Sequence, residues 1–327
     1  MVRRARRILP PYYAALIISL ALIALVPLLQ QPTTLMWDAE LPAFGIGSVL
    51  SHVALIHNLN ENWIFKINSP LWSVATEWQI YFLLPLVFLP LCRRWGMLPV
   101  LAVGLVFIFV PVFVPGLYPA SWWYVALFIF GMIAAQINFS NEAIYLYIRR
   151  RVPVAEIAVT MLIASLALNG TVWLHERSSL KSELWMGLFA ACWITASTQS
   201  LLENRRNLPR LSVAFFSATP LLSLGAMSYS VYLLHQPVLS IMAGLIYPRA
   251  QSVGVAFGVT VFAGVPVMLA VCYLFHRIFE RPFLSYRPRQ EDSFPDCVKI
   301  VPRGIENLQL ALPGPAPLCL STPEQNP

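Results

Sequence analysis

The chain has 327 residues, of which 58% are apolar and 11% are charged, and its mean hydropathy is +0.66. A soluble domain carries about a quarter charged residues, so the composition excludes an ordinary soluble protein and predicts a polytopic α-helical membrane protein. The net charge of +7 does not indicate nucleic-acid binding, because the basic residues flank apolar runs, as membrane orientation requires. The five cysteines show no CxxC pair and no metal-ligand spacing, so no metal site is predicted.

We predict an all-α, polytopic membrane helix bundle of about eight spanning helices. Each predicted span is an apolar run close to the roughly 20 residues that a bilayer requires. The first run has spanning length and no cleavage signature, so we expect it to act as its own signal and anchor. The predicted spans are residues 9–29, 71–91, 97–115, 121–137, 153–174, 184–202, 221–246 and 254–276.

Residues 43–59 are apolar but contain two glycines and two histidines. If this segment does not span, most basic residues fall on one side of the membrane, in clusters at 3–7, 93–94, 149–151, 205–210 and 277–289. The positive-inside rule then places both termini in the cytoplasm. We therefore predict that residues 43–59 form one re-entrant or interfacial segment on the outer side.

The composition changes at Ser285 to proline, glycine, glutamine and asparagine with little periodicity. Such a segment does not bury enough apolar surface to fold. We predict a membrane domain over residues 1–284 and a disordered cytoplasmic tail over residues 285–327.

A carboxylate lies inside one apolar run. The stretch 68–85, NSPLWSVATEWQIYFLLP, indicates a helix that enters the membrane and carries Glu77. An acidic residue at mid-membrane costs roughly 2.5–3.5 kcal/mol, so it requires a partner, a wet cavity or a function. Ser73, Glu77 and Tyr81 recur every fourth residue and share one stripe of the helix, and Trp72 marks its entry. Glu77 is either a structural carboxylate bonded to a neighbouring helix or, as we predict, a catalytic or substrate-orienting residue.

Two arginines precede the first apolar run. Arg4 and Arg7 share a face if this stretch is helical, which Pro10 permits only with a kink or a helix restart. Guanidinium pairs bind phosphate bidentately and stay charged, so they are candidates for binding a cytoplasmic donor such as a nucleotide or a coenzyme A thioester. The alternative is that both arginines only orient the chain.

The seventh predicted span also has a polar face. Ser228, Tyr232 and His235 follow at intervals of four and three residues, and His235 lies near mid-membrane by residue count. A titratable imidazole at this depth usually faces the bundle interior. It is either part of a functional site or a neutral histidine bonded to a helix carbonyl.

Two further polar features lie outside the spans. His52 and His57 are five residues apart on the segment 43–59 and are candidates for lining an acceptor site on the outer side. No third histidine or carboxylate completes a metal-ligand spacing there. Glu280-Arg281-Pro282, past the last span, is interpreted as a surface ion pair and a helix stop.

Three blocks, in this order, resemble a known family. RRARRILPPYY, NSPLWSVATEWQIYFLLPL and SLGAMSYSVYLLHQPVL, the last followed by FERPF, are similar to successive landmarks of the acyltransferase-3 family of integral membrane acyltransferases. The resemblance covers residues 3 to about 284. It aligns the family's motif residues with Arg4 and Arg7, with Trp72, Ser73 and Glu77, and with Ser228, Tyr229, Tyr232, Leu233 and His235.

The resemblance implies a bacterial inner (plasma) membrane enzyme that moves an acyl group from acyl-CoA to a hydroxyl. The acceptor it implies is a cell-envelope carbohydrate or glycolipid, such as lipopolysaccharide or exopolysaccharide, and acetyl-CoA is the expected co-substrate, with no bound cofactor. The implied donor-binding residues are Arg4 and Arg7, the implied catalytic residues are Glu77 and His235, and the acceptor-side candidates are Trp72, Ser73, Ser228, Tyr232, His52 and His57.

Members of the family usually begin with two more spanning helices, the first of which carries the histidine thought to activate the acceptor. We therefore expect a truncated member that lacks its general base and is inactive alone. Eight spans plus those two make the family's ten. The rival hypotheses are a catalytically inactive remnant and a proton-coupled transporter or flippase in which Glu77 and His235 relay protons. The sequence shows no internal repeat, which counts against a transporter.

Overall fold

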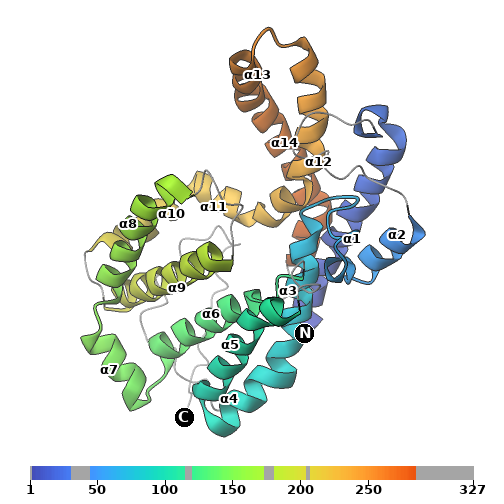
Figure 1. The fold of residues 1–327 in the computed structure, drawn as a ribbon. Helices are drawn as coiled ribbons and strands as arrows, with labels where there is room; N and C mark the ends of the chain where they lie inside the picture. Colours follow the sequence, from blue (N-terminus) through green and yellow to red (C-terminus); the bar gives the residue numbers. More distant parts are fainter. Residues whose placement is uncertain (1, 31–44, 115–119, 173–179, 204–206, 285–327) are drawn as a thin grey trace, which may run out of the picture. The chain divides into compact units, whose positions relative to one another are not determined.

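The computed structural model describes residues 2–30, 45–114, 120–172, 180–203 and 207–284, and every regular element within these ranges is a helix (Figure 1). The prediction of an all-α chain is therefore confirmed for this part of the chain. The predicted tail, residues 285–327, lies outside the described residues, and so do the last residues of two predicted spans.

The described ranges contain α-helices of very different length. They are α1 (Val2–Leu25), α2 (Ile46–Val53), α3 (Leu71–Leu83), α4 (Leu89–Trp95), α5 (Met97–Phe113), α6 (Tyr124–Phe139), α7 (Ala143–Arg151), α8 (Val154–Val172), α9 (Leu180–Leu202), α10 (Leu208–Phe216), α11 (Thr219–Ala226), α12 (Ser228–Ile246), α13 (Val253–Val259), α14 (Val265–Phe275) and α15 (Arg281–Leu284). The π-helical turns Leu84–Phe88, Thr260–Gly264 and His276–Glu280 continue α3 into α4, α13 into α14 and α14 into α15. Short 3₁₀ turns lie at Pro27–Gln30, His57–Leu59 and Tyr247–Arg249.

Four helical segments of the described chain are long and apolar enough to cross a bilayer: Val2–Leu25, Leu71–Trp95, Ser228–Arg249 and Val253–Leu284. The segments Tyr124–Phe139 and Ala143–Arg151 pass only as a pair bent by 87°. Each of the eight predicted apolar runs contains a helix, but several of these helices are shorter than a span requires. The described helices therefore support a polytopic membrane protein and do not confirm eight spans.

Helix α1 continues through Pro10 and Pro11, although we expected a kink or a restart at Pro10. Each proline removes one backbone donor from the helix. Pro11 and its neighbour Tyr12 are buried, so packing of this turn opposes the loss. Because the helix is continuous from Val2, Arg4 and Arg7 lie on one face of it.

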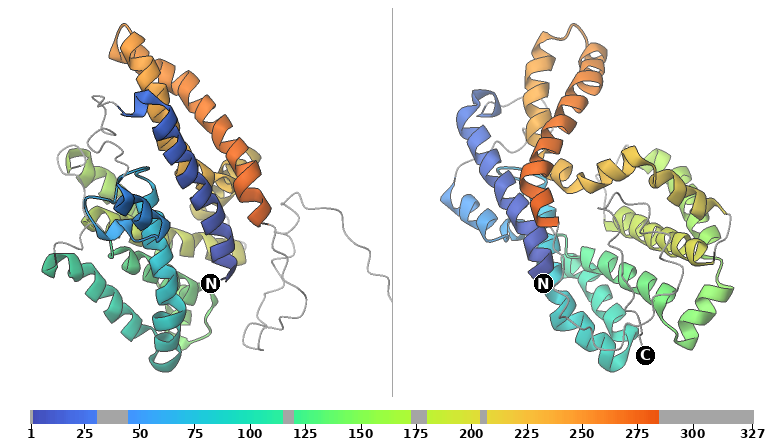
Figure 2. Two further views of the ribbon diagram at one scale, coloured as in Figure 1. Left: turned by 90° about the vertical axis from the view of Figure 1, so that its right-hand side faces the viewer. Right: turned by 180° about the vertical axis from the view of Figure 1, so that it is seen from behind.

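Helices α1, α3, α12 and α14 pack around one apolar core, and Figure 2 shows α1 beside α12 and α14. Its fully buried members include Tyr12, Leu71, Leu233 and Cys272. A second core lies between α3, α4, α5 and α6. The helices approach closely there, because a Cβ on Gly104 would lie 2.8 Å from the end of the Ile129 side chain of α6, which would have to shift to make room for it.

Helices α1 and α3 are antiparallel. Arg4 of α1 contacts Tyr81 near the end of α3, whereas the buried Asn68, just before α3, donates a hydrogen bond to Ser19 near the end of α1 at 3.1 Å. The end of α1 and the beginning of α3 therefore lie at the same end of the pair. The segment between them contains α2, whose 8 residues extend about 12 Å. Residues 45–59 thus form no spanning helix, as predicted for this segment.

The predicted span 221–246 is divided in two. Helix α11 ends at Ala226 and α12 begins at Ser228, with Met227 between them. A new helix start leaves backbone N–H groups without acceptors. One of these, on Ser230, donates at 3.2 Å to the carboxylate of Glu280. The apolar pattern is continuous across this break, so it does not predict the break.

Candidate functional site

Arg4, Tyr81 and Glu77 form a chain of contacts between α1 and α3. The Tyr81 hydroxyl donates a hydrogen bond to Glu77 Oε1, one turn earlier in the same helix. Arg4 Nη1 donates to the Tyr81 hydroxyl at 3.4 Å, and its guanidinium carbon lies 5.1 Å from the centre of the Tyr81 ring. Arg7 is near enough to interact electrostatically with the same hydroxyl. The polar stripe predicted on α3 thus connects the candidate donor-binding arginines with the candidate catalytic carboxylate.

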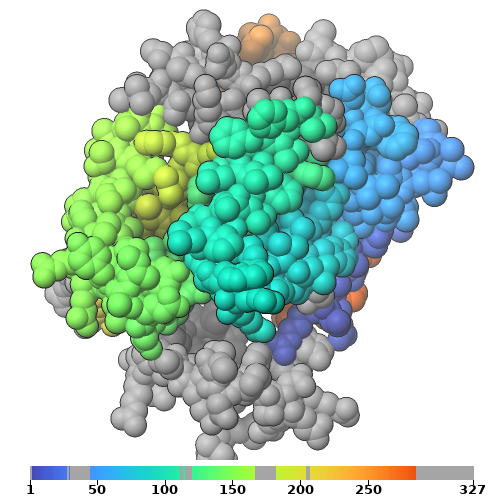
Figure 3. Space-filling view, turned by 60° about the horizontal axis from the view of Figure 1, so that its bottom comes forward, coloured from blue at the N-terminus to red at the C-terminus, as the bar shows by residue number. Residues whose placement is uncertain are grey.

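The residues at both ends of this series of contacts, the arginines and Glu77, are accessible. Arg4, Arg7 and Glu77 are exposed, and burial on α1 begins with Ile8. Figure 3 shows the amino-terminal end of α1, in dark blue, at the surface beside residues of the last helices, in orange. Exposed guanidinium groups keep their forked donors available for a carboxylate or a phosphate. Glu77 Oε2 makes no hydrogen bond within the described residues, so it can accept one from a ligand.

Ser73 and Tyr232 meet one turn of α3 away from Glu77. Their hydroxyls form a hydrogen bond, and the Tyr232 hydroxyl also donates to the carbonyl of Pro70 at 2.9 Å. In the preceding turn of α12, the Tyr229 hydroxyl donates to the carbonyl of Ile8 at 3.1 Å. Tyrosine hydroxyls of α12 therefore fix this helix to α3 and to α1. Two of the acceptor-side candidates are brought together next to the predicted carboxylate.

His235 is bonded to its own helix. Its Nδ1 lies 3.1 Å from the carbonyl oxygen of Val231 and 2.9 Å from that of Tyr232. Nδ1 must carry a proton to donate to these carbonyls, and this tautomer leaves a lone pair on Nε2. Within the described residues, no hydrogen bond or ion pair joins His235 to Glu77. The two predicted catalytic residues are thus both on the helices of this site but not in contact.

Trp72 and Ser228 make no polar contact with Glu77, Ser73 or Tyr232 within the described residues. The Trp72 ring faces Tyr124 of α6, with 5.7 Å between the ring centres. Ser228 is the exposed first residue of α12 and forms no hydrogen bond within the described part of the chain. Neither contacts Glu77 through a hydrogen bond in the part of the chain that the structure describes.

His52 and His57 are interior residues. Their rings stack with 3.8 Å between the centres and 9° between the planes, and neither ring is exposed. His52 Nδ1 donates to the carbonyl of Ser48 at 2.8 Å, and the Tyr12 hydroxyl of α1 donates to the His52 carbonyl at 2.8 Å. Burial lowers the pKa of His52, and burial together with the neighbouring His52 ring lowers the pKa of His57 to about 3. The pair is therefore neutral at pH 7 and offers no exposed surface to an acceptor in this conformation.

Glu280-Arg281-Pro282 was interpreted from the sequence as a surface ion pair and a helix stop, and both interpretations are wrong, since the helix continues through Pro282 in α15 and Glu280 is buried. Its exposed fraction is 1%. Glu280 Oε2 accepts hydrogen bonds from the backbone N–H and the hydroxyl of Ser230 and from His276 Nδ1, the last at 2.9 Å. Its Oε1 is buried without a partner in the described residues. The residue joins the start of α12 to the π-helical turn His276–Glu280.

Asn68 is a second residue whose role the sequence did not reveal. It is fully buried, and its Nδ2 donates to Ser19 Oγ at 3.1 Å and to the Leu233 carbonyl at 2.8 Å. It therefore joins α1, the start of α3 and α12. The available signal was its position as the first residue of the motif that begins NSPLW.

The acyltransferase-3 family model, described as an acyltransferase domain, matches residues 1–277 of this chain. The matched range contains every candidate residue named above except Glu280. No curated protein and no solved structure gives a significant match. Because the family match covers most of the sequence, the chain belongs to the acyltransferase-3 family.

Proposed function

We propose, from the premise that this chain is an acyltransferase-3 protein, that it transfers an acyl group from acyl-CoA to a hydroxyl of a cell-envelope carbohydrate or glycolipid. We expect acetyl to be the acyl group. The observation that carries the proposal is the Arg4–Tyr81–Glu77 chain, which joins exposed guanidinium groups to an exposed carboxylate on a membrane helix. A phosphate-bearing donor and a hydroxyl-bearing acceptor require these two kinds of group.

The donor would bind at the amino-terminal end of α1. Arg4 and Arg7 lie on one face of a continuous helix, and two guanidinium forks suit a pyrophosphate. In the proposal this end of α1 faces the cytoplasm of a bacterial cell, where acyl-CoA is available. Tyr81, which lies under the Arg4 guanidinium, holds it in place by a hydrogen bond and a cation–π contact.

The transfer itself exchanges one carbonyl bond for another. The acceptor oxygen attacks the thioester carbonyl carbon, a carbon–oxygen bond forms, and the carbon–sulfur bond breaks. The hydroxyl proton must leave during attack, and the coenzyme A thiolate takes up a proton. Glu77 has an oxygen without a partner and His235 has a free lone pair on Nε2. We propose that these two residues orient the acceptor hydroxyl or assist this proton movement.

The donor site is tested by Arg7→Lys, which keeps the positive charge but removes the planar fork. We expect coenzyme A affinity to fall roughly ten- to hundred-fold, since one charge-assisted contact is worth about 1.5–3 kcal/mol. The measurement is a coenzyme A titration of purified protein in detergent. Arg6→Lys is the matched control, because a helix turns residue 6 away from the face of Arg4 and Arg7. If the Arg7→Lys and Arg6→Lys variants bind coenzyme A with equal affinity, Arg7 only orients the chain in the membrane.

The carboxylate is tested by Glu77→Gln, which preserves size and removes the charge. In this chain joined to the two upstream helices that the family usually carries, we expect transfer of labelled acetyl from acetyl-CoA to membrane glycans to fall about a hundred-fold, the lower end of the range for a proton-transfer group. Coenzyme A affinity should be unchanged, because Glu77 does not touch the donor phosphates in the proposal. Full transfer activity in the glutamine variant would return Glu77 to the structural interpretation.

A further inference from the structure

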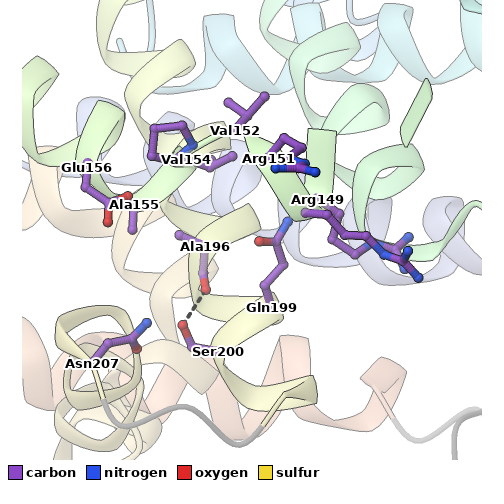
Figure 4. A pocket seen from close by; sticks show the side chains of 12 residues that line it. Arg149, Arg151, Val152, Val154, Ala155, Glu156, Ala196, Gln199, Ser200 and Asn207 are labelled. Carbon is purple, nitrogen blue, oxygen red and sulfur yellow. Dashed lines mark hydrogen bonds between the residues drawn. The ribbon is translucent and has the colours of Figure 1, made fainter. Parts of the chain in front are cut away.

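A polar pocket of about 270 Å³ lies where α7, α8, α9 and α10 meet (Figure 4). It is lined by the end of α7, the first turn of α8, the last turns of α9 and the residue before α10. We propose that this pocket binds the phosphate group of an anionic ligand. The proposal concerns a site separate from the Arg4–Tyr81–Glu77 chain and does not rest on the transfer reaction.

Arg149 builds the wall of the pocket rather than its binding surface. Its Nε donates to the Ile137 carbonyl at 2.9 Å and its Nη2 to the Ser140 carbonyl at 2.8 Å. These carbonyls belong to the end of α6, where helices lack internal donors. Arg149 therefore fixes the bend between α6 and α7, and this bend presents the next two residues to the pocket.

Arg150 and Arg151 line the pocket with side chains that are exposed and make no hydrogen bond or ion pair within the described residues. Arginines that only orient a helix need no cavity and no converging donors. Here a cavity exists, and the only carboxylate in its lining is Glu156, which is likewise exposed and unpaired in the described chain. Three guanidinium groups against one carboxylate leave the lining positive.

Neutral donors from two other elements converge on the same pocket. Gln199 Nε2 is buried and has no hydrogen-bond partner among the described residues, and Figure 4 shows its amide end reaching toward Arg151. Asn207 Oδ1 accepts from the Arg210 N–H at 3.3 Å as the cap of α10, so its Nδ2 donors remain for the pocket. A buried amide donor without an acceptor is costly, and an anion would supply that acceptor.

The first turn of α8 adds backbone donors to these side chains. The Val154 N–H donates to the Val152 carbonyl and the Ile157 N–H to the Pro153 carbonyl. The N–H groups of Ala155 and Glu156 remain without a backbone acceptor in the described chain, and both residues line the pocket. The positive end of the helix dipole favours an anion at the same place.

The chemistry selects phosphate among anions. Several donors from a guanidinium pair, two amides and a helix start match a phosphate group, which has two or three free acceptor oxygens and one or two negative charges. Two sources carry this group on the same side of a membrane: the headgroup of an anionic phospholipid and a soluble phosphate. The experiment must separate them.

We would titrate the full chain, purified in a non-ionic detergent at low ionic strength, with inorganic phosphate and with short-chain phosphatidylglycerol. Binding is read from the concentration dependence of the melting temperature, since a ligand of the folded state raises it. We expect saturable binding of both probes. At least ten-fold tighter binding of phosphatidylglycerol identifies a lipid headgroup as the ligand, and equal or weaker binding identifies a soluble phosphate.

The double variant Arg150→Gln/Arg151→Gln should weaken binding of either probe at least ten-fold. Arg93→Gln/Arg94→Gln removes the same charge from the exposed end of α4 and should leave binding unchanged. If loss of two arginines disturbs membrane insertion, Gln199→Leu decides, because it removes the buried donor without changing charge and should weaken binding several-fold. The proposal is overturned if neither probe saturates, or if the pocket variants bind as the α4 control does.

Discussion

Two carboxylates of this bundle have opposite surroundings. Glu77 of α3 is exposed, accepts one hydrogen bond from the Tyr81 hydroxyl and keeps its second oxygen open. Glu280 is 1% exposed, and one of its oxygens accepts three hydrogen bonds from Ser230 and His276. The two carboxylates therefore differ both in their access to solvent or ligand and in the number of hydrogen bonds that the protein gives them.

Accessibility distinguishes the carboxylate that we propose to be functional, Glu77, from the buried Glu280. A buried charge must be compensated by the protein itself, and removing a partner is strongly destabilising. An accessible charge in a membrane helix is compensated by water or by a ligand, and it stays available for binding. Glu280 therefore fixes where α12 starts, and the start of α12 in turn positions Tyr229 and Tyr232, which contact α1 and α3.

The largest effect is expected from Glu280→Ala. The change leaves the Ser230 N–H, the Ser230 hydroxyl and His276 without their acceptor in the interior. We expect the free energy of unfolding to fall by about 3–5 kcal/mol, because each buried donor left without its acceptor costs about 1–3 kcal/mol. The measurement is thermal or chemical unfolding of the purified chain in detergent.

Glu61→Ala is the matched control, because Glu61 is an exposed carboxylate in the loop before α3. Its effect should stay within about 0.5 kcal/mol. Glu280→Gln should lie between the two, since its amide oxygen still accepts from Ser230. A Glu280→Ala protein as stable as the Glu61 control would remove the distinction between the two carboxylates.

A smaller effect on the free energy of unfolding is expected from a change of pH, which acts through the buried histidines His52 and His57. The pKa of His57 is lowered to about 3 by burial and by the His52 ring, whereas the unfolded chain has a histidine pKa near 6.5. Above pH 6.5 His57 is neutral in both the folded and the unfolded protein, so the site takes nothing from the free energy of unfolding. As the pH falls toward 3 the unfolded state binds the extra proton, and stability is lost. At pH 5 the loss from His57 is about 2 kcal/mol.

The measurement is the melting temperature between pH 7 and pH 5 for the wild type and for His57→Phe, which keeps an aromatic ring against His52. The wild type should lose more stability than the variant over this range. Parallel pH profiles would mean that the histidine stack is protonated without penalty and is not part of the closed interior.

Helical spacing was enough to predict one of the two carboxylate sites. Ser73, Glu77 and Tyr81 share a stripe because they lie in one uninterrupted helix, and the structure places Tyr81 against Glu77 as that spacing requires. Long apolar runs likewise predicted helices at the observed places, because lipid requires a continuous apolar segment with its backbone bonded internally. Both are local properties of the chain.

The interior site could not be predicted in this way. Ser230 and Glu280 are separated by 50 positions, and nothing in either neighbourhood indicates that they meet. The break at Met227 depends on that meeting, so the apolar run 221–246 was predicted as one helix. The stacking of His52 on His57 depends on the turn between α2 and the 3₁₀ turn His57–Leu59, which histidine spacing does not reveal. Chain segments and their periodicity were predictable, whereas contacts between distant polar residues were not.

A pair of hydroxyl deletions compares the two carboxylates directly, and one of them, Tyr81→Phe, has the smallest expected effect. Ser230→Ala removes the hydroxyl donor of Glu280, and Tyr81→Phe removes that of Glu77 while keeping the ring under Arg4. A hydrogen bond to a charged group is worth about 1.5–3 kcal/mol when it is buried, so Ser230→Ala should cost about 2 kcal/mol. Water can replace the Tyr81 hydroxyl at the exposed Glu77, so Tyr81→Phe should cost less than about 1 kcal/mol. Both values come from unfolding of the purified variants under the same conditions. Equal losses in the two variants would mean that Glu77 is as enclosed as Glu280, and the argument that Glu77 is open to an acceptor would fail with it.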